Sequence, residues 1–163
     1  MKPAPPISIA PLDPGLLEDR DLRLELVTFK PHAVHLVPAY HFRMMDEGSG
    51  EEAGTINLRL GWDENLTQYA GHVGYGVHEA FQGRRYAARS VTLLKPLARQ
   101  HGFTEIWITC NPDNAASRRS CELAGAELIE TVDLPATSQY YARGMRQKCR
   151  YRLAITGCPT SRA

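Results

Sequence analysis

The sequence predicts an α+β domain whose mixed, mostly antiparallel twisted sheet has about six to seven strands flanked by helices. Two observations support this prediction. Short segments with strand character follow one another through the first half of the chain, and the second half reads strand, helix, strand, helix, strand, strand. A chain of 163 residues has the size of one ordinary domain, so residues 1–163 are expected to form a single unit.

The first half is expected to begin with an irregular arm and to continue as antiparallel strands. Prolines at positions 3, 5, 6, 11 and 14 predict the arm over residues 1–20. Apolar and polar residues alternate over residues 22–29 and again over 54–60, and residues 39–45 read as a strand between them. Residues 46–52 have the composition of a turn, which predicts a hairpin of the second and third strands.

The second half is expected to form two strand–helix units and a closing pair of strands. Apolar residues recur at helical spacing from Ala87 to Ala98, although Pro96 conflicts with this pattern because it removes a backbone donor. The strands at 71–77 and 103–109 should be parallel neighbours joined by a right-handed crossover. The other expected elements are a polar loop at 61–70, helices at 87–101 and 114–124, strands at 126–132 and 148–155, and a polar, mobile segment at 135–147.

Charge and composition narrow the function. The 19 basic and 18 acidic residues give a net charge of +1, which argues against a general nucleic-acid or membrane-surface binder. The basic residues are unevenly placed, however, so a local anion site remains compatible with the sequence. The arginines between residues 71 and 128 include Arg84, Arg85, Arg89, Arg118 and Arg119.

The cysteines predict free thiols in a reducing, cytoplasmic setting, because no C-x-x-C pair and no secretory segment is present. The four cysteines are Cys110, Cys121, Cys149 and Cys158. No apolar run approaches the roughly 20 residues of a membrane helix. His32 and His35 lack companion ligands, so we expect no metal site.

A short basic turn opens the first predicted helix, with the sequence Gln82-Gly83-Arg84-Arg85-Tyr86-Ala87. A helix start presents unpaired N–H groups and a partial positive charge, and phosphates bind there readily. Gly83 would let a pyrophosphate approach the backbone, and the arginines could contact it directly. On its own, the turn is equally compatible with a helix start that carries solvated arginines. It is neither a dinucleotide-binding fingerprint nor a P-loop.

Residues 71–128 resemble the GNAT superfamily of acyl-CoA-dependent N-acetyltransferases. The family signature, Arg/Gln-x-x-Gly-x-Gly/Ala, appears as the turn at 82–87. Asn114-Ala115-Ala116-Ser117, with Glu122 and Gly125, is similar to the helix that flanks the cofactor in that family. Two further phrases, Gly71-His72-Val73-Gly74-Tyr75 and Ile108-Thr109-Cys110-Asn111, resemble a branch of predicted acetyltransferases with undefined substrates.

The resemblance implies direct transfer of an acetyl group from acetyl-CoA to an amine. The thioester would lie in a splay between the strands at 71–77 and 103–109, where a backbone N–H polarises its carbonyl. For Asn114 and Ser117, a helix-capping role is equally expected and does not exclude a cofactor contact. The residues that the resemblance assigns to acetyl-CoA are Val77, His78, Gln82, Gly83, Arg84, Arg85, Tyr86, Ala87, Asn114 and Ser117.

The chain departs from the family pattern in three ways. Arg85 stands where the family usually has glycine, so the backbone there must suit an L-residue. Cys121 stands seven residues after Asn114, where many members carry a tyrosine that protonates the leaving thiolate. The segment between the first two strands is shorter than the family's usual helical pair. The acceptor site is therefore expected to be open or completed by a second subunit, which makes a homodimer reasonable.

The candidate catalytic residues each have a structural alternative. An unperturbed histidine has a pKa near 6.5, which suits a general base, so His72 is one candidate. The alternative that we favour is a structural histidine at the edge of the core, held by hydrogen bonds. Cys121 could act as a weak S–H proton donor to the departing sulfur. More often, however, a cysteine of this kind is buried and serves packing only. Tyr75 alternates away from His72 and is expected in the core.

The last predicted strand carries three cations on one face: Lys148, Arg150 and Arg152. We expect them to protect an edge strand from pairing with other chains. Binding of an anionic acceptor is the alternative.

The sequence therefore predicts an N-acetyltransferase that acts on a primary amine of a small molecule or a protein. A non-catalytic acyl-CoA-binding or regulatory module of the same fold is the alternative, because the family's general acid is missing at Cys121. An unrelated binder of phosphate ligands is a further one. No nucleic acid or membrane partner is expected.

Overall fold

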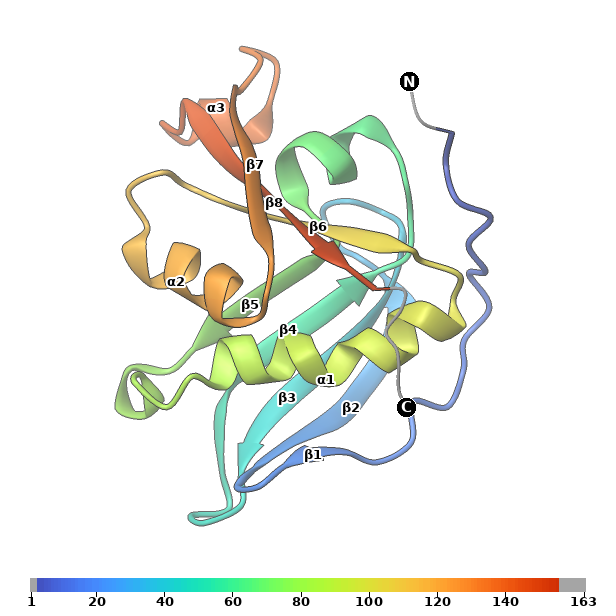
Figure 1. Ribbon diagram of the computed structural model, residues 1–163, viewed down its shortest axis with the longest axis vertical. Helices are drawn as coiled ribbons and strands as arrows, with labels where there is room; N and C mark the ends of the chain where they lie inside the picture. Colours follow the sequence, from blue (N-terminus) through green and yellow to red (C-terminus); the bar gives the residue numbers. More distant parts are fainter. Residues whose placement is uncertain (1–2, 156–163) are drawn as a thin grey trace, which may run out of the picture.

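Eight strands form two antiparallel sheets in the computed structural model, which describes residues 3–155 (Figure 1). The first sheet has the order β1-β2-β3-β4-β5 and the second the order β6-β8-β7. The strands are β1 (Leu17–Asp19), β2 (Leu22–Pro31), β3 (Pro38–Asp46), β4 (Glu51–Arg59), β5 (Val73–Val77), β6 (Glu105–Cys110), β7 (Glu127–Asp133) and β8 (Gln147–Ala154). The expected α+β class is confirmed, although part of the predicted arm pairs as β1 with β2.

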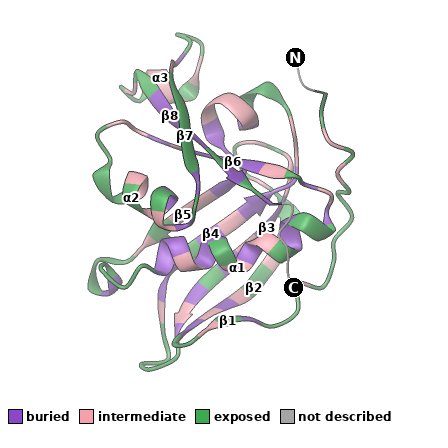
Figure 2. Cartoon of the chain, in the orientation of Figure 1, coloured by how far each residue is buried: buried purple, intermediate pink, exposed green. Residues whose placement is uncertain are grey.

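The predicted hairpin is formed by β3 and β4. Tyr40 pairs with Leu58 and Phe42 with Ile56, and all four side chains are buried. Because successive residues of a strand point to opposite faces, this register places a continuous apolar row on one side of the sheet. Figure 2 shows the buried residues concentrated where the sheet faces α1.

The helix α1 (Tyr86–Gln100) lies across the first sheet and covers that apolar row (Figure 1). Its buried side chains include Val91, Leu94 and Ala98, which confirms the predicted helical face. Pro96 lies inside the helix but on its exposed side, where a backbone carbonyl that loses its partner can bond to water. Pro96 therefore does not end the helix, despite the missing backbone donor.

Two segments differ from their expected structure. Residues 61–70, predicted as a loop, contain a π-helix, η1 (Asn65–Ala70), whose first turn is fixed by the Asp63 carboxylate accepting from Leu66 N. Residues 135–147 contain the short helix α3 (Gln139–Ala142), whose N-terminus is capped by Ser138. The remaining elements are η2 (Glu79–Phe81) and α2 (Ala115–Leu123).

The expected parallel pairing of the strands at 71–77 and 103–109 is wrong, since β5 and β6 belong to different sheets. They approach at one point, where His72 N donates to Trp107 O at 2.7 Å. A Cβ on Gly71 would lie 2.9 Å from that same oxygen, so the close approach requires glycine there. Beyond this point no ladder joins the two strands, and the chain leaves a gap between the sheets.

The expected edge-strand role of the last strand is also wrong. β8 is the middle strand of the second sheet, between β6 and β7. Arg150 and Arg152 instead form ion pairs across the ladder with Glu130 and Glu127 of β7. Lys148 has no carboxylate partner among the described residues.

Among residues 3–155, no helix combines the length and the apolar character that crossing a membrane needs. Cys110, Cys121 and Cys149 are buried free thiols, and Cys158 lies outside the described residues.

Candidate functional site

A cavity of about 240 Å³ occupies the gap between β5 and β6. Its walls come from both strands, from the ends of β4 and η1, from the start of α2, from β8 and from α3. Polar side chains from several parts of the chain therefore meet there. The lining residues are Arg59, Ala70, Val73, Gly74, Tyr75, Thr109, Cys110, Asn111, Asn114, Ser117, Tyr140 and Lys148.

Tyr75 reaches from β5 to the first turns of α2. Its hydroxyl lies 2.9 Å from Ser117 Oγ and 3.8 Å from Cys121 Sγ. Asn114 caps the same helix, with its Oδ1 accepting from Ser117 N at 3.0 Å, which confirms the capping role predicted for Asn114. Tyr75 packs against the hydrophobic core, as its alternation suggested, and it also lines the cavity.

The protons of this cluster are held on Tyr75 and Cys121. Burial is the main cause that raises the pKa of Tyr75. A hydrogen bond from Cys121 lowers the pKa of Cys110 to about 7, and the same interaction, together with burial, raises the pKa of Cys121. The thiol proton of Cys121 is thus directed at Cys110, and the Tyr75 phenol stays protonated beside the start of α2.

His72 is fully buried at the point where the two sheets meet. Its Nδ1 accepts from Trp107 N at 2.9 Å and its Nε2 lies 3.0 Å from Gly61 O. The ring is stacked on Trp62 and touches Phe103 edge-on. Burial lowers the pKa of His72 to about 3. Both ring nitrogens are occupied, so the geometry favours the structural alternative over the catalytic one.

The turn before α1 presents free backbone donors. No side chain caps this helix, and the first helical bond within it starts at Arg89 N, which donates to Arg85 O. Gly83 has φ +90° and Arg85 has φ +62°, so the turn uses the left-handed region twice. A non-glycine residue in that region is strained, and here it stands where the resemblance expects glycine. The open N–H groups and the helix dipole make this end suited to a phosphate.

Two of the predicted cofactor residues are engaged by acidic side chains. Arg84 Nη1 forms an ion pair with Asp46 at 3.2 Å, and its guanidinium lies over the Phe81 ring. Tyr86 is 1% exposed and its hydroxyl donates to Asp46 and Asp21. The Tyr86 side chain is therefore part of the core, and only its backbone N–H, like that of the buried Ala87, faces the turn.

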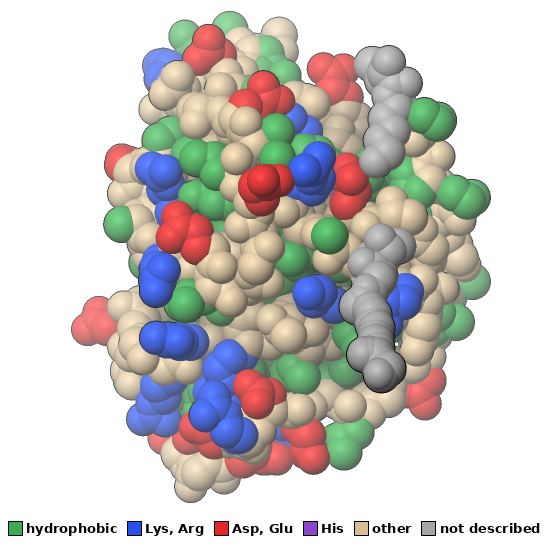
Figure 3. Space-filling model, in the orientation of Figure 1, with side chains coloured by type: hydrophobic (Ala, Val, Ile, Leu, Met, Phe, Trp, Pro, Cys, Tyr) green, Lys and Arg blue, Asp and Glu red, His purple; other side chains and the backbone are tan. Residues whose placement is uncertain are grey.

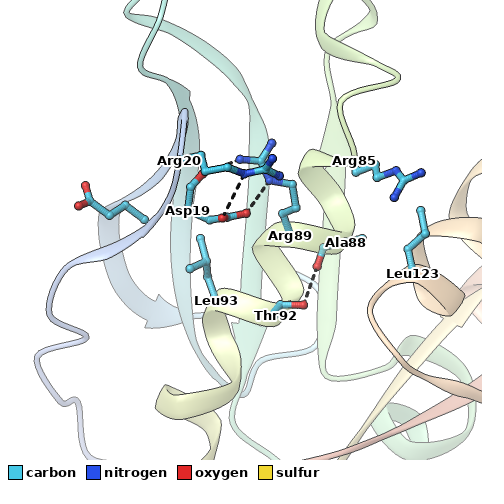
Figure 4. Close-up of a pocket in the computed structure, with 9 residues that line it drawn as sticks. Asp19, Arg20, Arg85, Ala88, Arg89, Thr92, Leu93 and Leu123 are labelled. Atoms are coloured by element: carbon cyan, nitrogen blue, oxygen red, sulfur yellow. Dashed lines mark hydrogen bonds and ion pairs between the residues drawn. The ribbon is translucent and has the colours of Figure 1, made fainter.

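Arg85 is exposed and borders a groove of about 430 Å³ between α1, β1 and α2. Figure 4 shows Arg85 extending toward Leu123, whereas Arg89 turns to Asp19. Figure 3 shows Lys and Arg side chains gathered at the lower left of the view, over the turn that precedes α1 and the neighbouring β1. Arg85 is thus the arginine of the turn that stays available to a ligand.

The remaining residues predicted to bind acetyl-CoA lie at or just after the end of β5. His78 N donates to Ala53 O at 2.7 Å, and the His78 ring pairs with Glu52 at the surface. Because successive N–H groups of an antiparallel strand point to opposite edges, Val77 N–H points toward the open side of β5. Gln82 is exposed, with its Nε2 3.4 Å from Val77 O.

The cavity also holds two cations, of which Arg59 was missed by the sequence reasoning. Arg59 and Lys148 are each 8% exposed. Arg59 lies in an alternating strand with no signature around it, so the sequence offers no signal for it. Tyr75 was expected in the core, and its hydroxyl contacts with Ser117 and Cys121 depend on how β5 meets α2, which the local sequence pattern does not indicate.

The comparisons identify the fold and the family. A family model for an acetyltransferase (GNAT) domain matches residues 23–127. RimL, a ribosomal L7/L12 alpha-N-protein acetyltransferase solved with coenzyme A, is 14% identical with a TM-score of 0.62, over 86% of this chain and 98% of that chain. A search of curated proteins finds no match.

Two other solved structures have the same fold. The ribosomal-protein-S5-alanine acetyltransferase from Vibrio fischeri is 18% identical with a TM-score of 0.57, over 72% of this chain and 62% of that chain. The microcin C7 self immunity acetyltransferase MccE, in complex with acetyl-CoA and AMP, is 16% identical with a TM-score of 0.55, over 71% and 61% of the two chains. Together with the family model, which spans well over half of the sequence, these findings show that the chain belongs to the GNAT family of acetyltransferases, for which acetyl-CoA is the acyl donor.

Proposed function

We propose that this enzyme transfers the acetyl group of acetyl-CoA to a primary amine, with the thioester bound in the cavity between β5 and β6. The observation that supports it is the combination of this cavity with an uncapped helix start at the end of the same strand. A pantetheine arm in the gap would lead to a pyrophosphate on the N–H groups of α1, with Arg85 beside it.

The reaction would proceed by direct attack. The amine nitrogen attacks the thioester carbon, a C–N bond forms, and the C–S bond breaks. Val77 N–H, at the open edge of β5, would stabilise the oxyanion. The proton from the amine leaves to water, and the thiolate of CoA takes one from a donor at the cavity wall. Water then returns a proton to that donor.

Tyr75 is the donor that we assign to the thiolate. Its phenol is in the cavity, keeps its proton because burial raises its pKa, and is aligned by Ser117. Cys121 occupies the helix position at which the family often has tyrosine, and the Tyr75 hydroxyl lies 3.8 Å from its sulfur. A tyrosine from the strand would therefore replace one from the helix, which removes the main reason for a non-catalytic module.

The acceptor is proposed only as a class. RimL is by its name an acetyltransferase of a ribosomal protein's α-amino group. A protein N-terminus is therefore one acceptor to test here, beside small amines. A reducing, cytoplasmic location fits the free thiols of Cys110 and Cys121, which lie in contact without forming a disulfide.

The test is calorimetric titration with acetyl-CoA, followed by thiol release with a panel of amines. Micromolar binding that CoA competes for and ATP does not, with amine-dependent thiol release, is the expected result. Arg85→Glu should weaken binding at least tenfold, because it reverses the charge beside the pyrophosphate. Lys95→Glu, further along α1, is the matched control and should bind normally. Absence of binding at millimolar acetyl-CoA would refute the proposal.

A further inference from the structure

Two cationic side chains that have no carboxylate partner among the described residues form one wall of the cavity between β5 and β6. Arg59 of β4 and Lys148 of β8 are both more than nine-tenths buried, and both line the cavity. Within residues 3–155, neither forms an ion pair. Burying charge without a partner is costly, so such groups are normally paired or bound to a ligand.

The guanidinium of Arg59 has donors to spare. Its Nη1 donates to Ala70 O and Gly71 O, each at 2.9 Å, which fixes the group in place. Its Nε is buried and has no acceptor in the described part of the chain. Its Nη2 lies over Gly74, where a Cβ would collide with it. Glycine at position 74 therefore makes the room that this guanidinium occupies.

Lys148 adds a second positive charge on the same side. Its Nζ lies 4.6 Å from the centre of the Tyr140 ring, and it has no hydrogen-bond acceptor within the described residues. Burial lowers its pKa, and the charge of Arg59 lowers it further. An anion between the two groups would relieve both effects.

In the proposed transfer, the cations would lie on the acceptor side of the gap. Tyr75 points to α2, where the donor thiolate would be protonated, and Gly74, the residue before it, faces the opposite side with Arg59. The other cations of β8, Arg150 and Arg152, are engaged by Glu130 and Glu127. Among the residues that line the cavity, the unmatched charges are thus those of Arg59 and Lys148, away from the turn proposed for the pyrophosphate.

The same cavity has one unmet acceptor. Asn111 Oδ1 is buried and has no donor among the described residues. An amine N–H could supply that donor. The wall therefore offers positive donors for an anionic group and an oxygen for an amine.

We propose that the acceptor is an amine that carries a carboxylate a few bonds from its nitrogen, and that Arg59 and Lys148 bind this carboxylate. This inference rests on the proposed acetyl transfer and names its substrate class. The carboxylate can belong to a free amino acid or to an acidic residue at a peptide N-terminus, and guanidinium groups bind it in either case.

The test compares matched acceptors by thiol release from acetyl-CoA. Free amino acids are compared with their carboxamides, and peptides with Asp or Glu near the N-terminus with the Asn or Gln versions. In at least one series, the carboxylate member should have a kcat/KM about 10- to 100-fold higher, as expected for hydrogen bonds to a charged group. The series that shows the preference identifies the source of the carboxylate.

Variants assign the preference to the two cations. Lys148→Met keeps the length of the side chain and Gly74→Ala displaces the guanidinium, so each should reduce the preference at least tenfold. Arg152→Gln, on the same strand but paired with Glu127, is the control and should keep it. Lys148→Met leaves the guanidinium in place, so a folding defect in Gly74→Ala alone does not decide the result.

The outcomes separate the two proposals. If acetyl-CoA binds and neutral amines are acetylated as fast as their carboxylate partners, the carboxylate site is refuted while acetyl transfer stands. If acetyl-CoA does not bind, the transfer proposal itself fails. A preference that survives in both Lys148→Met and Gly74→Ala would also overturn the assignment.

Discussion

At the scale of single residues, the position of the Tyr75 hydroxyl leads to the first prediction. Tyr75→Phe removes the proton donor while keeping the ring that packs in the gap, so kcat should fall about 10²-fold, the usual contribution of a general acid. The affinity for acetyl-CoA should change little. Steady-state thiol release, with calorimetry for binding, measures both quantities.

The control for this prediction is Tyr141→Phe in α3, whose ring lies under Arg146 away from the cavity. It should behave like the unaltered protein. Cys121→Ser tests the competing donor and should leave most of the activity. A Tyr75→Phe enzyme with normal kcat would show that the phenol serves packing alone.

His72 makes stability depend on pH. Its pKa is about 3 in the folded protein and near 6.5 in the unfolded chain, so between these pH values the unfolded chain binds a proton and the folded protein does not. The contribution of His72 to the free energy of unfolding is complete above pH 6.5. It is lost as the pH falls toward 3, by up to about 1.4 kcal/mol per pH unit. His35, with a pKa lowered to about 4 by burial, acts in the same direction.

We therefore expect the free energy of unfolding to decline between pH 6.5 and about 5, a window in which carboxylates scarcely titrate. Urea unfolding at several pH values measures it. His72→Gln should be less stable at neutral pH and should have a flatter profile. An unchanged slope in that variant would assign the pH dependence to other groups.

At the scale of elements, the turn before α1 carries strain that can be measured. Arg85→Gly should raise the free energy of unfolding by about 0.5–1 kcal/mol, because the left-handed backbone costs an L-residue more than glycine loses in chain entropy. It should also weaken CoA binding, since a guanidinium is lost beside the pyrophosphate. Leu36→Gly, at another exposed residue with positive φ, should give the stability gain without the loss of affinity. A lower stability of Arg85→Gly would contradict the strain.

The elements themselves were largely readable from the sequence. The pattern of α1 and the alternation of β2 and β4 are local, so they identified these elements. The gap between β5 and β6 was not readable from local pattern, because one contact, at His72 and Trp107, decides where the sheets separate. The central place of β8 and the burial of Arg59 also depend on long-range packing. Only the family resemblance supplied the splay, whereas the basic sequence at 82–87 already suggested a phosphate turn.

At the scale of the whole molecule, the two sheets are joined at one edge by the contact of His72 with Trp107 and are separated beyond it by the cavity. A ligand that fills the cavity and also binds the start of α1 touches parts of both sheets, so its binding energy should appear in the global unfolding transition. The dimer expected from the open acceptor region stays a prediction.

Acetyl-CoA should therefore stabilise the molecule as a unit. At 100 times its Kd it adds about 2.7 kcal/mol, which corresponds to a rise in Tm of roughly 5–10 °C for a chain of this size. Differential scanning calorimetry should show one transition that shifts with acetyl-CoA and with CoA, and stays in place with ATP. Arg85→Glu should need a higher ligand concentration for the same shift, whereas Lys95→Glu should match the unaltered protein. An equal shift with ATP would mean that the α1 turn binds phosphates without the cavity, and two separate transitions would mean that the ligand does not couple the sheets.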